Sequence, residues 1–315
     1  MNILVTGGAG FIGSHLCERF LALGHALTIL DNFNDFYDPA IKRQNLTGLE
    51  DAQLVEGDIR DRDLVRKIFA DGNFDAVVHL AAMAGVRPSL KDPLLYEDVN
   101  IRGTLGLLEE VRLRPEMRFV LASSSSVYGG NESVPFKETD DISRPVSPYA
   151  ATKRAAELMA YTHQHLYGNP ITCLRFFTVY GPRQRPEMAI HRFVAATLAG
   201  EAIPFFGDGT TRRDYTYIDD IIDGVVRATE RCSGYEIYNL GESATTTLAE
   251  LVDEIGQACG REVILDRQPM QPGDVEITYA DVSKAREMLG YRPSTTVREG
   301  LARFVEWYRS VHPKA

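Results

Sequence analysis

Apolar residues follow two different spacings along the first part of the chain. Short apolar runs, typical of buried parallel strands, occur at 2–6, 26–30, 53–56, 75–80, 119–122 and 171–177. Between these runs, apolar side chains recur at the three- and four-residue spacing of a helix, at 14–23, 62–69, 93–112 and 149–167. Strands that alternate with helices predict a parallel sheet with helices on both faces. We therefore expect an α/β fold built on a doubly wound parallel sheet.

The regular alternation ends near residue 177, where we place a domain boundary. A stretch typical of a loop, Tyr-Gly-Pro-Arg-Gln-Arg-Pro, occupies 180–186, and helical and short β patterns then follow in no repeating order. We expect residues 1–177 to form the larger domain and residues 178–315 a smaller C-terminal α/β domain. A segment at about 214–240 is expected to return to the first domain.

The totals for the whole chain exclude several classes of function. A net charge of −10 argues against nucleic acid as a partner, and it means that an anionic substrate needs a local cluster of arginines. The 4 cysteines are scattered without paired spacing, as is typical of reduced thiols. No stretch approaches the roughly 20 apolar residues of a membrane span. Since a strand pattern begins at Asn2, we expect no signal peptide and a cytoplasmic protein. No metal site is predicted.

A glycine-rich turn follows the first predicted strand directly. Gly7, Gly10 and Gly13 stand between that strand and a helix, and the second strand ends at Asp31. This order of strand, glycine turn, helix, strand and acid is the context of a dinucleotide site of the Rossmann type, although the glycine spacing departs slightly from Gly-x-Gly-x-x-Gly. The glycines let the backbone approach a pyrophosphate, and the helix N-terminus stabilises its charge. Because Asp31 would accept hydrogen bonds from both ribose hydroxyls and repel a 2′-phosphate, we expect NAD rather than NADP.

Ligands of such sheets bind at the carboxyl ends of the strands, where several chemically distinct features meet. The features that fall there are Gly10, Asp31, Asp58, Ala81 and Ser124. Asp58 follows a strand at a place where an adenine could be contacted, and the small residue Ala81 lets a cofactor lie close to the backbone. His79 lies within a buried strand, and we interpret it as a core residue. The sequence thus predicts one cleft at this edge of the sheet.

Tyr149 and Lys153 form a candidate proton-transfer pair. They are four residues apart on a predicted helix and therefore share one face. A lysine ammonium beside the phenol is expected to lower the tyrosine pKa from about 10 towards neutrality. A serine at the end of the strand at 119–122 can hydrogen-bond the same substrate oxygen. This combination is suited to converting an alcohol to a ketone.

Five further motifs specify a family. They are Ala84-Gly-Val-Arg87, Ser123-Ser-Ser-Ser-Val-Tyr-Gly129, Arg175-Phe-Phe-Thr-Val-Tyr-Gly-Pro182, Arg185-Pro-Glu-Met188 and Arg213-Asp-Tyr-Thr-Tyr-Ile-Asp-Asp220. Together with the glycine turn and the Tyr149/Lys153 pair, they make the chain resemble the extended short-chain dehydrogenases/reductases over essentially its whole length. Within that superfamily it is similar to the nucleotide-sugar epimerases, and most closely to the UDP-glucuronate 4-epimerases.

The resemblance implies roles for individual residues. Ser124, Tyr149 and Lys153 would be the catalytic triad, with Tyr149 as the general base and Lys153 also binding the nicotinamide ribose. Domain 1–177 would bind NAD through Gly7, Gly10, Phe11, Ile12, Gly13, Asp31, Asn32, Asp58, Ile59, Leu80, Ala81, Ala82, Ala84, Asn100, Tyr149, Lys153 and Phe176. Domain 178–315 would bind the UDP-sugar, and the substrate-binding residues expected in the whole chain are Arg87, Ser125, Ser126, Thr178, Arg185, Arg192, Arg213 and Asp274.

The resemblance also implies a reaction and an assembly. NAD would take hydride from the sugar C4 and return it to the opposite face of a 4-keto sugar, with no net oxidation. Since a 4-keto uronate can lose CO2, an epimerase must hold its carboxylate still, and Ser125, Ser126, Thr178 and Arg185 are the donors that we expect to do so. The helices from Pro93 and from Tyr149 are the usual dimer surface of the family, so a homodimer is expected.

Three other functions stay open at this point. A UDP-glucose 4-epimerase would share the mechanism with a neutral sugar, although such enzymes usually carry asparagine where this chain has Thr178. A UDP-glucuronate decarboxylase or a 4,6-dehydratase would carry acids where this chain has Ser125 and Ser126. A non-catalytic NAD-binding regulator would need none of the catalytic residues, yet Ser124, Tyr149 and Lys153 are all present.

Overall fold

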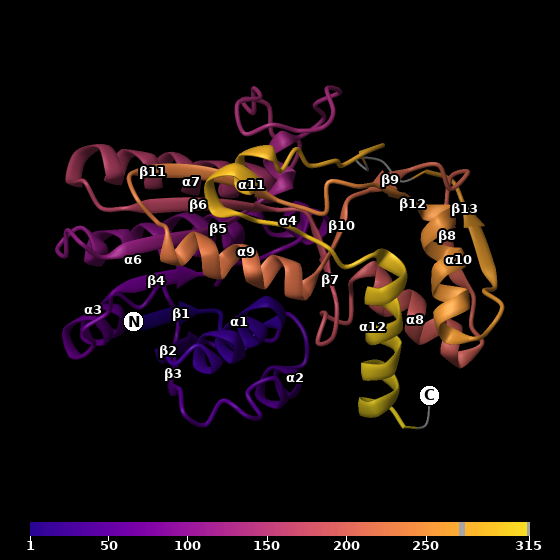
Figure 1. The fold of residues 1–315 in the computed structure, drawn as a ribbon, viewed down its shortest axis with the longest axis horizontal. Coiled ribbons are helices and arrows are strands. Elements are labelled where there is room, and N and C mark those ends of the chain that lie inside the picture. The colour runs from indigo at the N-terminus through magenta and orange to yellow at the C-terminus, as the bar shows by residue number, and fades with distance from the viewer. Residues whose placement is uncertain (271–274, 314–315) are drawn as a thin grey trace.

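A seven-stranded parallel sheet forms the centre of the protein in the computed structural model, which describes residues 1–270 and 275–313 (Figure 1). The strands run in the order β3-β2-β1-β4-β5-β6-β11. Their bounds are β3 (Gln53–Glu56), β2 (Ala26–Asp31), β1 (Asn2–Thr6), β4 (Ala76–His79), β5 (Arg118–Ser124), β6 (Ile171–Phe176) and β11 (Tyr235–Leu240). The doubly wound α/β fold expected from the sequence is confirmed.

The pleat of β1 shows how the sheet divides the core into two layers. Ile3 and Val5 belong to one apolar cluster, together with residues of α1 (Phe11–Ala22) and α9 (Ile218–Glu230). Leu4, between them, belongs to the cluster on the other face. That second cluster includes side chains of α3 (Arg62–Asp71), α6 (Thr104–Val111) and α7 (Pro148–Tyr167). Because successive side chains of a strand point to opposite faces, an unbroken apolar run buries both sides of the sheet.

The helices agree with the sequence pattern in position and differ in detail. Helix α1 begins at Phe11, three residues before the expected start, because the turn ends at Gly10. The helix expected at 93–112 is three consecutive pieces, α5 (Pro93–Glu97), a π-helix (η1, Asp98–Gly103) and α6. Short elements that the apolar pattern did not indicate are α2 (Pro39–Gln44), α4 (Val86–Lys91), β7 (Thr178–Tyr180) and the 3-10 helix η2 (Ser125–Tyr128).

The remaining elements gather mostly beyond the carboxyl ends of the strands (Figure 1). They are α8 (Ala189–Ala199), β8 (Ile203–Phe206), β9 (Arg212–Arg213), β10 (Tyr215–Tyr217), β12 (Thr246–Thr247), α10 (Leu248–Cys259), β13 (Leu265–Gln268), α11 (Ser283–Leu289) and α12 (Val297–Val311). They form two-stranded sheets, β10-β7, β12-β9 and β13-β8. Strand β11, from the segment at 214–240, lies at the edge of the central sheet. The boundary near residue 177 stays a prediction.

The structure also bears on the cysteines and on membrane spans. The 4 cysteines are all buried, free thiols. Over residues 1–270 and 275–313, no helix combines the length and the apolar character that a membrane span requires.

Candidate active site

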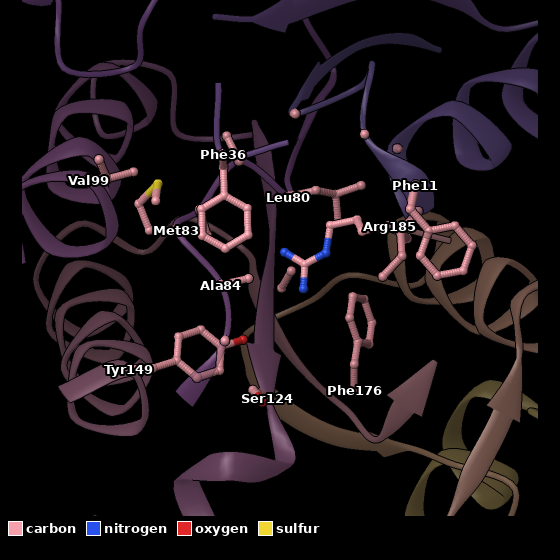
Figure 2. Close-up of a pocket in the computed structure, with 18 of the residues that line it drawn as sticks. Phe11, Phe36, Leu80, Met83, Ala84, Val99, Ser124, Tyr149, Phe176 and Arg185 are labelled. Atoms are coloured by element: carbon pink, nitrogen blue, oxygen red, sulfur yellow. The ribbon is translucent and has the colours of Figure 1, made fainter. Parts of the chain in front are cut away.

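A cavity of about 400 Å³ lies at the carboxyl ends of the central strands. It brings together segments that are far apart in the sequence, from the glycine turn to the strand ends near residue 178 (Figure 2). The predicted residues that line it are Gly7, Gly10, Phe11, Ile12, Gly13, Asp31, Asn32, Asp58, Ile59, Leu80, Ala81, Ala82, Ala84, Ser124, Ser125, Ser126, Tyr149, Lys153, Phe176, Thr178 and Arg185. Most of the residues predicted from the sequence therefore meet in one place.

The glycine turn leaves no room for side chains. Gly7 has φ +73°, and a Cβ there would lie 2.7 Å from the backbone nitrogen of Ala81. A Cβ on Gly13 would lie 2.2 Å from the Gly7 carbonyl oxygen. The turn therefore packs tightly against the end of β4, and helix α1 starts directly beside it at Phe11. The first backbone N–H groups of a helix have no partners within the helix, so this end favours an anion such as a pyrophosphate.

Asp31 closes the end of β2 with its side chain buried. Its carboxylate accepts hydrogen bonds from the backbone N–H of Ala9 at 3.2 Å and of Phe33 at 2.9 Å. Lys42, on α2, places its ammonium 3.6 Å from the same carboxylate. The sequence analysis missed Lys42, although Asp38 followed by Pro39 is a recognisable helix start: the Asp38 side chain caps the N–H of Ala40.

The Tyr149 hydroxyl points into the cavity towards Ser124 (Figure 2). Burial raises the pKa of Tyr149 above its ordinary value, while a hydrogen bond with Ser124 and the positive charge of Arg185 act in the opposite direction. The expected lowering of this pKa by Lys153 is wrong for the protein without ligand, because desolvation of the phenolate outweighs the nearby charges. Arg185 is instead the cation that stabilises the phenolate.

Lys153 is buried one helical turn from Tyr149, and its ammonium donates to the Ala122 carbonyl oxygen at 2.8 Å. Burial lowers the pKa of Lys153 to about 8, and the carboxylate of Glu157 opposes that shift. Glu157 is itself fully buried and accepts two hydrogen bonds from Arg175, each at 2.9 Å. The carboxylate of this buried ion pair therefore favours the charged form of Lys153, a feature that the sequence analysis did not find.

Asn100 does not line the cavity, although we predicted a cofactor contact. It is buried in the π-helix, where its side chain accepts from the Met83 N–H at 2.8 Å and donates to the Met83 carbonyl oxygen at 2.9 Å. It also donates to the hydroxyl of Thr152 on α7 at 3.0 Å. Asn100 thus joins the cavity wall around Met83 to the helix that carries Tyr149.

Ser125, Ser126, Thr178 and Arg185 also line the cavity, and the guanidinium carbon of Arg185 lies 5.5 Å from the centre of the Phe36 ring. Ser125 and Ser126 begin the 3-10 helix η2, and Thr178 begins β7, which is aligned by parallel pairing with β10. The guanidinium of Arg185 reaches into the cavity in Figure 2 and forms an ion pair with Glu187 at 3.1 Å. These groups provide neutral and charged hydrogen-bond donors in the same cavity as Ser124 and Tyr149, and a carboxylate requires such donors.

The predicted substrate residues Arg87, Arg192 and Arg213 lie outside the lining of this cavity. Arg87 is exposed on α4, with its guanidinium carbon 5.8 Å from the centre of the Phe206 ring. Arg192 is exposed on α8. Arg213 is half-buried and donates to the carbonyl oxygen of Arg212 at 2.9 Å. Asp274 lies outside the described residues. Their roles in binding a UDP group stay predictions.

Comparison with known families decides where the chain belongs. A family model described as GDP-mannose 4,6 dehydratase matches residues 4–304. The chain belongs to this family. It is a family of extended short-chain dehydrogenases/reductases, as the sequence motifs indicated.

This short-chain dehydrogenase/reductase is similar to named relatives and to solved structures. A UDP-glucuronate 4-epimerase of Thermodesulfobacterium geofontis is 43% identical over 308 residues, which cover 96% of this chain and 95% of the relative. A crystal structure of UDP-glucuronic acid 4-epimerase from Bacillus cereus contains UDP-glucuronic acid and NAD. That protein is 35% identical in sequence, and its structure matches with a TM-score of 0.91 over 99% of this chain and 100% of that chain. UDP-glucose 4-epimerase from Thermotoga maritima, with UDP-glucose, matches at 35% identity over the same shares with a TM-score of 0.92.

The cavity of this short-chain dehydrogenase/reductase fits an NAD molecule. The cradle at Gly7 and Gly13, which a Cβ would fill, suits the pyrophosphate, and the buried carboxylate of Asp31 suits a ribose diol. Further along the sheet, Phe176 provides an apolar wall near Tyr149 and Lys153. NAD is also the cofactor present in solved relatives.

Proposed function

We propose that this protein is a UDP-glucuronate 4-epimerase that uses NAD as its bound redox cofactor. One observation carries the proposal: the cavity that fits NAD also brings Ser124 and Tyr149 together with Thr178 and Arg185, which can hold a carboxylate. A proton-transfer pair alone would suit any sugar alcohol. The added donors favour an acidic sugar.

The residues of the chain supply the proton chemistry. NAD, when bound, supplies the acceptor that takes hydride from the sugar C4 and later returns it, and its cationic ring favours the Tyr149 phenolate. Tyr149 takes the proton from the 4-hydroxyl and gives it back after the keto sugar has turned over. Ser124, which already shares a hydrogen bond with Tyr149, donates to the same sugar oxygen. Lys153, whose ammonium donates to the Ala122 carbonyl oxygen, would bind the nicotinamide ribose.

The second task of the site is to prevent decarboxylation. A 4-keto uronate loses CO2 when its carboxylate bond aligns with the ketone π system. Hydrogen bonds from Ser125, Ser126 and Thr178, together with Arg185, would hold that bond out of alignment. An unpaired carboxylate in a cavity is costly, so these donors also favour binding of the uronate over a neutral sugar.

The residues around the triad argue against a dehydratase or decarboxylase. Loss of water from the sugar needs an acid and a base close to C5 and C6. The acids in the described cavity lining are Asp31 and Asp58, at the ends of β2 and just after β3. Beside Ser124 the chain has Ser125 and Ser126, and their hydroxyls cannot act as the acid and the base that loss of water requires.

Proton NMR of the products tests the proposal directly. The purified protein is incubated with UDP-glucuronate and, separately, with UDP-glucose. We expect UDP-galacturonate from the first reaction and much slower epimerisation in the second. UDP-pentose as the main product from UDP-glucuronate would contradict the epimerase proposal, and reaction of UDP-glucose alone would contradict the uronate assignment.

Substitution of Thr178 tests the carboxylate contact. Thr178→Val keeps the shape and removes the donor, so turnover of UDP-glucuronate is expected to fall roughly 10- to 100-fold, as for loss of a hydrogen bond to a charged group. Turnover of UDP-glucose serves as the internal control and is expected to change far less, while some UDP-pentose forms from UDP-glucuronate. Thr178→Ser, which keeps the hydroxyl, is expected to restore selectivity. Equal losses on both sugars would refute the contact.

We also propose that the protein is a homodimer through α5 and α7. Large apolar side chains are exposed on these two helices, with Leu94 on α5 78% exposed and Leu166 on α7 61% exposed. Exposed apolar groups that cluster on adjacent helices are typical of an interface. Sedimentation analysis is expected to give a dimer, and Leu94→Glu to shift it towards monomer.

A further inference from the structure

His79 has a hydrogen-bond partner on each ring nitrogen, although it is only 2% exposed. Its Nδ1 lies 2.6 Å from the hydroxyl oxygen of Thr6, at the end of β1. Its Nε2 lies 2.9 Å from the hydroxyl oxygen of Thr104, where α6 begins. The side chain therefore bridges the strand that leads into the glycine turn and the helix that follows Asn100.

The partners of Thr104 fix the direction of the hydrogen bonds. The Thr104 hydroxyl has one proton, and it donates this proton to the Asn100 carbonyl oxygen at 2.6 Å. It can therefore only accept from His79, so Nε2 must carry a proton. Burial, and then the charge of Lys153, lower the pKa of His79 to about 3, so the ring is neutral. Its Nδ1 is then an acceptor.

The direction of the hydrogen bonds at Thr6 follows from the same count of protons. Because Nδ1 accepts, the Thr6 hydroxyl donates to it, and the Thr6 oxygen is free to accept the N–H of Ala81 at 3.3 Å. Ala81 is the cavity residue against which Gly7 packs. Every donor and acceptor in this line is used once, in one direction, from the cofactor cradle to the backbone of Asn100.

A second series of hydrogen bonds runs from Asn100 to α7, the helix that carries Tyr149. The Asn100 side chain donates to the Thr152 hydroxyl at 3.0 Å, and Thr152 donates to the carbonyl oxygen of Tyr149 at 2.9 Å. Backbone and side chain of Asn100 thus connect two hydrogen-bonded segments. The first contains His79 and the second reaches the catalytic tyrosine.

We propose that His79 is a positioning residue that sets the placement of the cofactor cradle relative to Tyr149. The neutral ring, protonated on Nε2, fixes the spacing between β1, the wall at Ala81 and the π-helix that carries Asn100. In the opposite tautomer, Nδ1–H would donate to the Thr6 oxygen. The proton of the Thr6 hydroxyl would then have no acceptor in this series of hydrogen bonds. The ring is therefore more than a core side chain that fills space.

Nitrogen NMR of the histidine rings tests the tautomer without any sugar. In uniformly ¹⁵N-labelled protein with NAD added, the His79 ring is expected to show a protonated Nε2 and an unprotonated Nδ1, unchanged over the range of about pH 5–8 in which ordinary histidines titrate. The His79→Gln spectrum identifies the resonances by their loss. A proton on Nδ1, or titration within that range, would overturn the proposal.

Threonine substitutions test the positioning role, and this arm rests on the proposed epimerase function. Thr104→Val leaves Nε2–H without its acceptor, so kcat is expected to fall about tenfold or more while KM for the UDP-sugar stays within about threefold. Thr104→Ser, which keeps the hydroxyl, is expected to restore most of kcat.

Thr229 provides a matched control on α9. It is fully buried, and like Thr104 it donates to the carbonyl oxygen four residues earlier, at 2.8 Å, but within the described part of the chain its hydroxyl forms no hydrogen bond with a histidine. Thr229→Val removes the same kind of hydrogen bond to the helix backbone without leaving a ring N–H unpaired, so it is expected to lower thermal stability less than Thr104→Val and to leave kcat within about twofold. Equal kcat losses in the two valine variants, or failure of Thr104→Ser to restore turnover, would overturn the positioning role. If no UDP-sugar reacts at all, the proposed function fails while the tautomer experiment still decides the hydrogen-bond chain.

Discussion

Replacement of Glu157 by glutamine perturbs the buried ion pair between Glu157 and Arg175, whose carboxylate raises the pKa of Lys153. Glu157 and Arg175 are 0% and 1% exposed, and their two hydrogen bonds are both 2.9 Å long. The Glu157 carboxylate also accepts a hydrogen bond at 2.6 Å from the hydroxyl of Ser123, the residue before Ser124. Glutamine keeps the size of the side chain and removes its charge, so the Arg175 guanidinium stays buried without a counter-ion.

The burial of the pair determines the expected magnitude. Removal of one partner of a buried ion pair typically costs about 3–5 kcal/mol, because the remaining charge is desolvated and uncompensated. Glu254 and Arg298 offer a matched control, since they form the same two-bond geometry at 2.9 and 3.0 Å with the arginine side chain 68% exposed. Glu254→Gln is expected to cost about 0–1 kcal/mol.

Urea unfolding of both variants measures these free energies, and a pH–rate profile measures the effect on catalysis. The Glu157 carboxylate raises the pKa of Lys153 against burial, so its loss lowers that pKa further below about 8. Lys153 then loses its proton at lower pH, and the alkaline limb of kcat/KM is expected to move to lower pH. Similar costs for Glu157→Gln and Glu254→Gln, or an unmoved alkaline limb, would refute the reasoning.

Three further outcomes are expected. Tyr149→Phe lowers kcat by about 10²–10⁴-fold, while NAD and UDP-sugar still bind in calorimetry; near-normal turnover would exclude Tyr149 as the base. The unmodified protein binds NAD more tightly than NADP, and Asp31→Asn narrows the ratio of the two measured Kd values. Burial and the neighbouring Asp220 and Asp214 raise the pKa of Glu242 to about 8, so the folded protein holds this proton and its stability falls as pH rises towards 8. Glu242→Gln is therefore expected to raise the unfolding free energy at pH 9 by about 1 kcal/mol after allowance for solvent screening, with little gain at pH 5; an equal gain at both pH values would contradict the cause.

Local sequence patterns were sufficient to predict six of the seven strands of the central sheet and much of the cavity. Apolar runs of strand length and helical spacing report directly on which faces are buried. The glycine turn is recognisable because Gly7 and Gly13 are required by backbone contacts at fixed positions after a strand. Tyr149 and Lys153 are recognisable because helical spacing places both on one face. These signals depend on neighbours within a few residues of one another.

Other features of the site depend on contacts between distant segments. Lys42 reaches Asp31, and Glu157 meets Arg175, only after separate elements have packed. The π-helix in the middle of the segment at 93–111 also escaped the apolar spacing, which is the same for one long helix as for three pieces. No strand was predicted at Thr178–Tyr180, but these residues form β7 through pairing with β10, which begins at Tyr215.

The sequence by itself determined the doubly wound sheet and the glycine turn, because each is specified by local periodicity or by steric demands within one turn. Only the tertiary structure decided the protonation chemistry. The pKa values of Tyr149 and Lys153 are set mainly by burial, which opposes charge on both side chains. Burial is a property of all the segments that surround a group, so a four-residue spacing indicates that the two side chains are neighbours but not which of their protonation states the protein stabilises.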